Sequence, residues 1–265
     1  MIDRRAAFHA LHRAGRPLLL PNAWDHASAA ALAARGYPAI GTTSLGVAAT
    51  SGLPDGTAAT AGETLALARR LAGLPVLLSV DVEAGFSDDP AEVAEYVTEL
   101  SGLGVVGINL EDGCPDGTLA DPECIADKIA AVKAAVPDLF VNARTDTWWL
   151  SVADPLPQAL ARARAYRAAG ADGIFVPGTV DDATLRVLTE QLDAPVNALH
   201  QPGGPGLAEL GRAGVARVST GSLLFRAALG AALDAADAVR LGEHTAPTGL
   251  PSYAEVQALV PTAGT

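Results

Sequence analysis

The sequence has few basic residues. Only 18 of its 265 residues are Lys or Arg, against 30 Asp and Glu, so the formal net charge is −12. A nucleic-acid-binding surface needs clustered Lys and Arg, and no such cluster is present. The same negative charge would oppose binding to an anionic membrane surface. We therefore expect no nucleic acid and no membrane as partner, and we interpret the charge as an aid to solubility.

Cysteine is also scarce. Cys114 and Cys124 are the only two, and their spacing matches neither a disulfide framework nor a C-x-x-C metal site. No apolar run reaches the ~18 residues of a membrane-spanning helix. The first residues, M-I-D-R-R, lack the apolar core of a signal peptide. These absences predict a cytoplasmic protein with reduced cysteines.

One pattern recurs eight times along the chain: a short apolar run, a polar turn, and an Ala-rich segment of helical length that ends at Gly or Pro. The predicted strands are 18–24, 39–43, 76–82, 106–110, 140–145, 173–176, 196–199 and 216–220. The predicted helices are 26–35, 61–72, 90–103, 122–136, 156–169, 182–192, 206–213 and 222–240. Strict alternation of strand and helix indicates a parallel sheet covered by helices.

Local signals support the helix boundaries. Thr60 and Glu63 form a T-x-x-E capping box, and Asp89 and Asp121 each precede a proline at the first helical position. Helix ends are predicted at the glycines 36, 73, 104, 170 and 214.

Eight strand–helix units within about 250 residues are typical of a (β/α)₈ TIM barrel. We expect residues 1–265 to form one such domain. A doubly wound open sheet is disfavoured because residues 22–25, N-A-W-D, stand where a dinucleotide-binding fold often carries G-x-G-x-x-G. Residues 244–265 lie outside the eight units. Their amphipathic stretch 253–260 predicts an extra C-terminal helix that contacts a neighbouring subunit.

Acidic residues gather where the predicted strands end. Asp81 and Glu83 follow an apolar run, and their i, i+2 spacing places both on one face of a strand. Glu111 and Asp112 end the next apolar run in the same way. In a barrel these ends form the active-site face. Carboxylates without matching cations suit a hard divalent metal.

Arg144 ends the following strand and brings a cation to the same face. A guanidinium can bind a substrate carboxylate through two hydrogen bonds. A metal that bridges two substrate oxygens stabilises an enolate, the intermediate of lyases, decarboxylases and mutases that act on 2-oxo acids.

An ordered set of motifs extends this interpretation. The motifs are PNAWD at 21–25, GTTSLG at 41–46, LPD at 53–55, DVEAGF at 81–86, INLED at 108–112, NARTD at 142–146 and AGADGIFV at 169–176. Together they resemble the isocitrate lyase / phosphoenolpyruvate mutase superfamily over about residues 8 to 230. The resemblance implies a (β/α)₈ barrel, an essential Mg²⁺ and tetramers that swap a C-terminal helix. We expect Mg²⁺, with Mn²⁺ as the alternative, and a homo-oligomer that is a dimer or a tetramer.

The resemblance also implies roles for individual residues. The metal set is Asp81, Glu83, Glu111 and Asp55, of which one touches the ion and the others hold its water. The substrate-binding set is Thr43, Ser44, Leu45, Asn142, Arg144 and Asn197, with Arg144 on the carboxylate and the turn at 43–45 offering backbone N–H groups. Asp55 and Arg144 are also the expected catalytic residues.

The chain departs from the family in the parts that select a reaction. Isocitrate and methylisocitrate lyases carry K-[KR]-C-G-H in a lid after strand four, and mutases carry Lys and Asn there, but residues 113–121 read G-C-P-D-G-T-L-A-D. Cys114 is therefore interpreted as a loop thiol, with proton donation as the alternative. His200 is the only histidine at a predicted strand end and is an alternative acid–base residue.

Three functions follow as hypotheses. The leading one is a Mg²⁺-dependent lyase or decarboxylase that forms an enolate from a small 2-oxo or 2-hydroxy mono- or dicarboxylic acid. The second is a phosphonomutase or phosphonopyruvate hydrolase. The third is a protein that binds 2-oxo acids without turnover.

Overall fold

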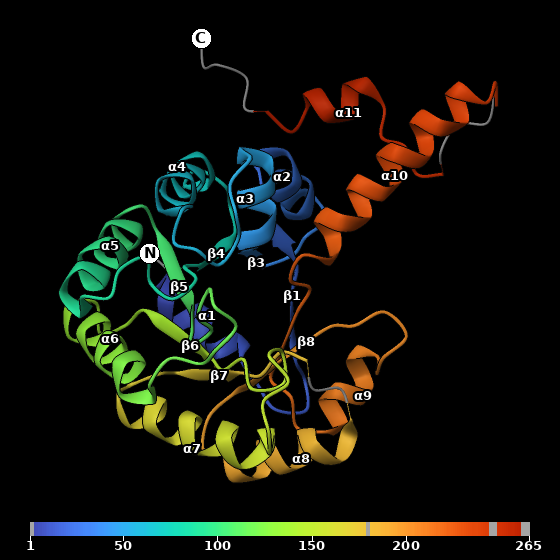
Figure 1. Ribbon diagram of the computed structural model, residues 1–265. Helices are drawn as coiled ribbons and strands as arrows, with labels where there is room; N and C mark the ends of the chain where they lie inside the picture. The colour runs from blue at the N-terminus through green and yellow to red at the C-terminus, as the bar shows by residue number, and fades with distance from the viewer. Residues whose placement is uncertain (1–2, 179–180, 244–247, 261–265) are drawn as a thin grey trace.

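The computed structural model describes residues 3–178, 181–243 and 248–260. Within them, nine strands form one parallel sheet in the order β1-β9-β8-β7-β6-β5-β4-β3-β2 (Figure 1). The strands are β1 Leu18–Leu20, β2 Asn22–Ala23, β3 Ala39–Thr42, β4 Leu77–Asp81, β5 Val105–Glu111, β6 Phe140–Arg144, β7 Gly173–Phe175, β8 Val196–Leu199 and β9 Arg217–Ser219. Because β1 and β2 follow one another directly, the sheet closes on itself. The predicted TIM barrel is confirmed.

The first predicted strand, 18–24, is divided in the structure. Proline has no N–H to donate to a strand ladder, and Pro21 separates β1 from β2. β1 pairs with β9, with Leu19 opposite Val218. β2 pairs with β3 on the other side, with Ala23 opposite Thr42. The break therefore lets one segment join the first strand of the barrel to both of its neighbours.

Most of the helices surround the barrel, whereas α10 and α11 extend away from it (Figure 1). The helices are α1 Arg4–Leu11, α2 His26–Ala34, α3 Ser44–Ser51, α4 Ala61–Leu71, α5 Pro90–Gly102, α6 Pro122–Ala135, α7 Pro155–Ala168, α8 Asp182–Gln191, α9 Leu207–Arg212, α10 Leu223–Arg240 and α11 Tyr253–Gln257. Sequence patterns missed α1, whose Phe8 lies edge-on to Phe140 of β6 at 5.5 Å between ring centroids. They also missed α3, which begins inside the predicted turn at 43–45. α11 falls within the predicted 253–260 stretch, whereas residues 244–247 and 261–265 lie outside the described residues.

Most of the expected helix boundaries hold. Asp89 and Asp121 accept hydrogen bonds from the backbone N–H groups of Ala91 and Glu123. The T-x-x-E capping box does not form, because the Thr60 hydroxyl donates to the buried Glu83 carboxylate instead. Of the predicted terminal glycines, only residue 73 lacks a positive φ.

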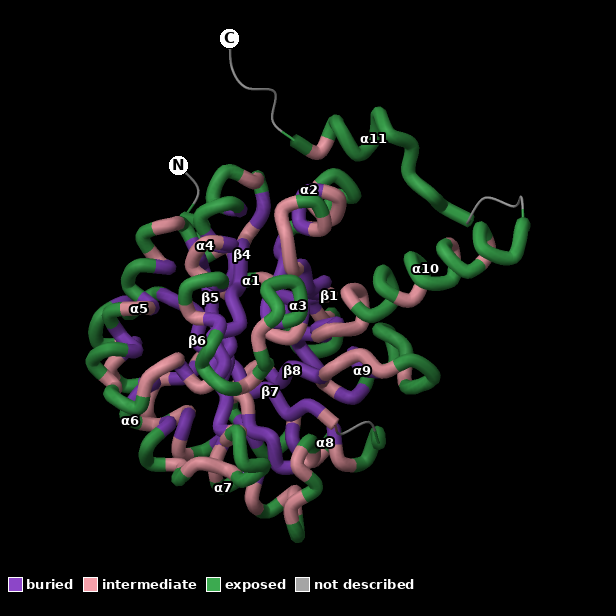
Figure 2. The backbone as a smooth tube through the Cα atoms, turned by 45° about the horizontal axis from the view of Figure 1, so that its top comes forward, coloured by how far each residue is buried: buried purple, intermediate pink, exposed green. Residues whose placement is uncertain are grey.

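The buried core of the barrel (Figure 2) contains polar groups beneath its upper rim, the end of the barrel where the strands have their C-termini. Arg217 of β9 is 1% exposed and donates from Nη2 to Asn109 Oδ1 at 3.1 Å and from Nε to Ser219 Oγ at 3.2 Å. Asn142 Nδ2 donates to the same Asn109 oxygen at 2.8 Å. Because arginine can only donate, the amide oxygen of Asn109 must face it. The side-chain Nδ2 of Asn109 is therefore directed away from Arg217.

Candidate active site

A cavity of about 370 Å³ opens at the C-terminal ends of the strands. Its wall combines acidic, amide, hydroxyl and apolar side chains from most of the barrel strands and the loops that follow them. The predicted residues that it brings together are Thr43, Ser44, Leu45, Asp55, Asp81, Glu111, Cys114 and Arg144. The first-turn N–H groups of Ser44 and Leu45, which have no acceptor within α3, also border this space. A helix N-terminus of this kind favours a negatively charged ligand.

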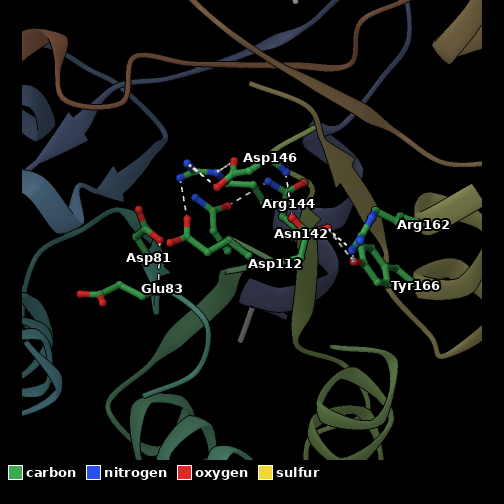
Figure 3. A network of polar contacts seen from close by, with 10 residues as sticks. Asp81, Glu83, Asp112, Asn142, Arg144, Asp146, Arg162 and Tyr166 are labelled. Carbon is green, nitrogen blue, oxygen red and sulfur yellow. Dashed lines mark hydrogen bonds and ion pairs between the residues drawn. The ribbon is translucent and has the colours of Figure 1, made fainter. Parts of the chain in front are cut away.

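Arg144 lies among acids and aromatic rings. Its Nε and Nη2 donate to the two Asp146 oxygens at 2.6 and 3.1 Å, and its Nη1 lies 2.7 Å from Glu111 Oε2 (Figure 3). The guanidinium carbon lies 5.8 and 5.7 Å from the ring centroids of Trp149 and Phe175. Burial opposes the charge, but the neighbouring acids raise the Arg144 pKa above its ordinary range. The side chain is therefore held in position as a permanent cation.

The acids in the cavity are hard to ionise together. Burial raises the pKa of Asp81 to about 6, Arg144 opposes this, and the charges of Asp55 and Glu83 add to it. Burial raises the pKa of Glu111 to about 8, again against Arg144 and with Asp81 adding to the shift. With all of these acids ionised, the site would hold more negative charge than Arg144 compensates, and a divalent cation would relieve that imbalance.

Glu83 does not line the cavity, so the expectation that it shares a face with Asp81 is wrong. β4 ends at Asp81, and Glu83 adopts a left-handed backbone conformation with φ of 50°. The i, i+2 rule applies only while the strand continues. The Glu83 carboxylate instead accepts hydrogen bonds from Ala58 N at 3.0 Å and from the Thr60 hydroxyl. Glu83 therefore holds the loop that carries Asp55.

The four predicted acids do not form one coordination shell. Among the described residues, no group of three or more His, Cys, Asp or Glu side chains is close enough to enclose a metal ion. Asp55, Asp81 and Glu111 nevertheless border the same cavity. Carboxylate oxygens fit Mg²⁺, which usually keeps several water molecules and takes only one or two protein carboxylates. The donor set therefore fits a hydrated ion rather than a closed metal cage.

Three other predicted residues lie away from the cavity. His200 borders a different hollow, outside the barrel, with Leu19 and Val218. Asn142 and Asn197 are buried and bind the neighbouring side chains Asn109 and Ser219.

Asn109 and Ser219 themselves reach the cavity wall. Sequence reasoning missed Asn109 as a site residue, although its i, i−2 relation to Glu111 on β5 places both on one face of the strand. Of the two cysteines, only Cys114 lines the cavity. It lies in a short hairpin closed by the bridge between Gly113 and Leu119.

A second polar network, centred on Asp112, supports Arg144 indirectly through Asp146 (Figure 3). Asp112 is fully buried, and its Oδ2 accepts from the Tyr166 hydroxyl at 2.7 Å and from Arg162 Nη1 at 3.1 Å. Its Oδ1 accepts from the backbone N–H of Asp146 at 2.8 Å. Asp112 thus fixes the position of the loop that carries Asp146, and Asp146 in turn accepts hydrogen bonds from Arg144.

Comparisons with known proteins agree with this arrangement. The family model described as phosphoenolpyruvate phosphomutase matches residues 8–240. The uncharacterized protein Rv1998c of Mycobacterium tuberculosis H37Rv is 49% identical over 252 residues, 95% of each chain. The 2-methylisocitrate lyase of Escherichia coli K12 is 35% identical over 65% of this chain and 62% of its own.

A solved structure, a provisionally assigned lyase/mutase from Burkholderia cenocepacia J2315, superposes with a TM-score of 0.89. It is 34% identical and covers 98% of this chain and 96% of its own. The chain belongs to the phosphoenolpyruvate phosphomutase family, within the isocitrate lyase / phosphoenolpyruvate mutase superfamily.

Proposed function

We propose that the protein is a Mg²⁺-dependent lyase or decarboxylase that forms an enolate from a small 2-oxo or 2-hydroxy acid, with Mn²⁺ able to replace Mg²⁺. One observation carries the proposal: four carboxylates, one fixed guanidinium and the N-terminus of α3 border a single cavity at the active-site face. Acids would attract the metal, and the guanidinium and helix N-terminus would attract an anionic substrate.

The metal would be held by Asp81, with Asp55 and Glu111 binding its water. When bound, it supplies Lewis-acid stabilisation of negative charge on substrate oxygens. Arg144 would bind the substrate carboxylate, and the Ser44 and Leu45 N–H groups would donate to the developing oxyanion. Asp55 and Cys114 border the same cavity and are the proposed groups for exchanging a proton with substrate carbon.

Turnover tests this proposal directly. Purified protein is incubated with Mg²⁺ and separate 2-oxo and 2-hydroxy acids, and products are followed by proton NMR. We expect cleavage or decarboxylation of at least one acid, and its arrest by EDTA with recovery on adding Mg²⁺. Specific binding of a 2-oxo acid without any product would favour the third hypothesis, a protein that binds 2-oxo acids without turnover. That hypothesis is motivated by the lid at residues 113–121, which lacks Lys and His.

The match to a phosphomutase model keeps phosphonate chemistry as the second candidate. It is weaker because Arg144 is the sole cation among the described residues of the cavity wall, whereas a phosphoryl group carries up to two negative charges. Phosphorus NMR of phosphonopyruvate with Mg²⁺ in the same assay distinguishes it, since a mutase or hydrolase would change the phosphorus signal.

We also propose a homo-oligomer, a dimer or tetramer, in which α10 covers a second copy. α10 extends away from the barrel (Figure 1) and has no buried residue, with Leu229 and Leu233 51% and 61% exposed. An apolar hollow of about 490 Å³ lies outside the barrel, bordered by Leu19 of β1, Leu32 of α2 and Leu207 of α9. A partner's α10 would fill that position.

Light scattering after size exclusion measures the assembly. We expect a dimer or tetramer for the natural chain and a smaller species for Leu233→Glu, because a buried unpaired carboxylate opposes the contact. A monomeric natural chain, or an unchanged mass for the variant, would contradict the proposal that α10 covers a second copy.

Among the described residues, every helix is too short or too polar to span a membrane. Both cysteines are free thiols, in keeping with the cytoplasmic location that we propose.

A further inference from the structure

A second guanidinium lies inside the barrel, below the cavity. Arg217 begins β9 and is 1% exposed, and no ion pair among the described residues includes it. Its Nη1 is one of their buried atoms without a hydrogen-bond partner. Burial lowers the pKa of Arg217 to about 9 and the charge of Asp81 opposes this shift, so the side chain stays a cation at neutral pH. Buried charges are normally paired, so this unpaired cation requires an explanation.

The hydrogen bonds of Arg217 lead to the cavity wall. Nη2 donates to Asn109 Oδ1 at 3.1 Å, and Nε donates to Ser219 Oγ at 3.2 Å. Both acceptors belong to residues that line the cavity, whereas Arg217 is not one of the described lining residues. Arg217 is therefore placed to orient side chains of the site rather than to touch a ligand itself.

Asn109 is held in one orientation by two donors. Its Oδ1 accepts from Asn142 Nδ2 at 2.8 Å as well as from Arg217. A reversed amide would set an N–H group against both donors, so the observed orientation is the one that satisfies them. Nδ2 of Asn109 donates to no group of the described residues, yet it is not one of their buried unpartnered atoms. This nitrogen therefore keeps access to the cavity that Asn109 lines.

The position of Asn109 makes such a donor useful. In the strand register Asn109 lies opposite Asp81 of β4, and it shares one face of β5 with Glu111. Ionised carboxylates only accept hydrogen bonds, so these two acids offer nothing to an oxygen of a bound anion. An N–H group between them supplies the missing donor. It would add to the Arg144 guanidinium and to the N–H groups at the start of α3.

We propose that Arg217 is a positioning residue for substrate binding: it holds Asn109 Oδ1, so that Asn109 Nδ2 donates a hydrogen bond to an oxygen of the bound 2-oxo acid. The inference rests on the proposed function, because it requires the acid to bind in this cavity. It also gives the buried, unpaired cation a role that offsets its cost in stability.

A double-mutant cycle tests the inference. Oxalate, which resembles the enolate of pyruvate, is the probe, and calorimetry in excess Mg²⁺ measures its affinity. Arg217→Met frees the amide to turn over, and Asn109→Ala removes the donor. Each is expected to weaken oxalate binding by about tenfold or more, as for a hydrogen bond to a charged group. The double variant should bind no more weakly than the weaker single variant, because Arg217 acts through Asn109.

Two controls separate positioning from stability and from net charge. Asn109→Asp keeps an acceptor for Arg217 and Asn142, so its unfolding temperature should not fall. Its oxalate affinity should still fall by about tenfold or more, because an oxygen replaces Nδ2. Arg186→Met removes the same charge as Arg217→Met, but from an exposed pair with Asp182 outside the cavity. It should bind oxalate as the natural chain does.

Several results would overturn the inference. They are natural oxalate affinity in Arg217→Met or in Asn109→Asp, losses that add in the double variant, and an equal loss in Arg186→Met. If Arg217→Met or Asn109→Ala does not fold, Asn109→Asp decides, because it removes the donor and keeps the contact with Arg217. Absence of Mg²⁺-dependent oxalate binding to the natural chain would instead count against the proposed function.

Discussion

Asp81→Ala is expected to lose more than about 100-fold in affinity for Mg²⁺, and with it the binding of oxalate, because it removes the proposed direct ligand rather than an outer one. Asp81 is 9% exposed and borders the cavity at the end of β4. Titration calorimetry of Mg²⁺, then of oxalate in excess Mg²⁺, measures both effects. Removing one of several crowded acids relieves repulsion, so the metal-free variant should unfold at the same temperature or higher.

Asp88→Ala provides the control with the same change in net charge. Asp88 is exposed and lies 4.0 Å from Lys128, outside the cavity. The affinity of the Asp88→Ala variant for Mg²⁺ should equal that of the natural chain. If Asp81→Ala retained natural affinity for both ligands, the metal would have to bind elsewhere and the proposed site would be wrong.

Asp112→Ala is expected to cost about 3–5 kcal/mol of unfolding free energy, the loss typical of breaking a buried ion pair. The substitution leaves Arg162 without its carboxylate and removes the acceptor of the Tyr166 hydroxyl. It also frees the Asp146 backbone N–H, so oxalate binding should weaken as well. Urea unfolding, monitored by circular dichroism, measures the change in free energy.

Two further variants calibrate that result. Tyr166→Phe removes the hydroxyl that donates to Asp112 at 2.7 Å and accepts from Arg162 at 3.4 Å, and should cost about 1.5–3 kcal/mol, as is usual for hydrogen bonds to charged groups. Asp237→Ala breaks an exposed pair with Arg240 and should change stability by less than about 1 kcal/mol. An Asp112→Ala variant as stable as Asp237→Ala would show that the buried network adds nothing to the fold.

Sequence patterns predicted the barrel because its signals are local. Alternating apolar runs and Ala-rich segments identify the strands and helices, and Asp89 and Asp121 marked two helix starts that the structure confirms. The closing of the sheet through Pro21 was not predicted, although proline's missing N–H is a local property. The helix α1 was missed because its role is to cover the barrel from below, a contact between residues more than 120 positions apart.

The sequence by itself determined which chemical groups reach the upper rim. Strand ends meet there in any parallel barrel, so Asp81, Glu111 and Arg144 had to share one face. Tertiary structure alone decided how their side chains are arranged. Glu83 turns away because the strand has ended, and His200 lies outside the barrel. Backbone dihedrals and long-range hydrogen bonds set those directions, and neither follows from the spacing of residues along the chain.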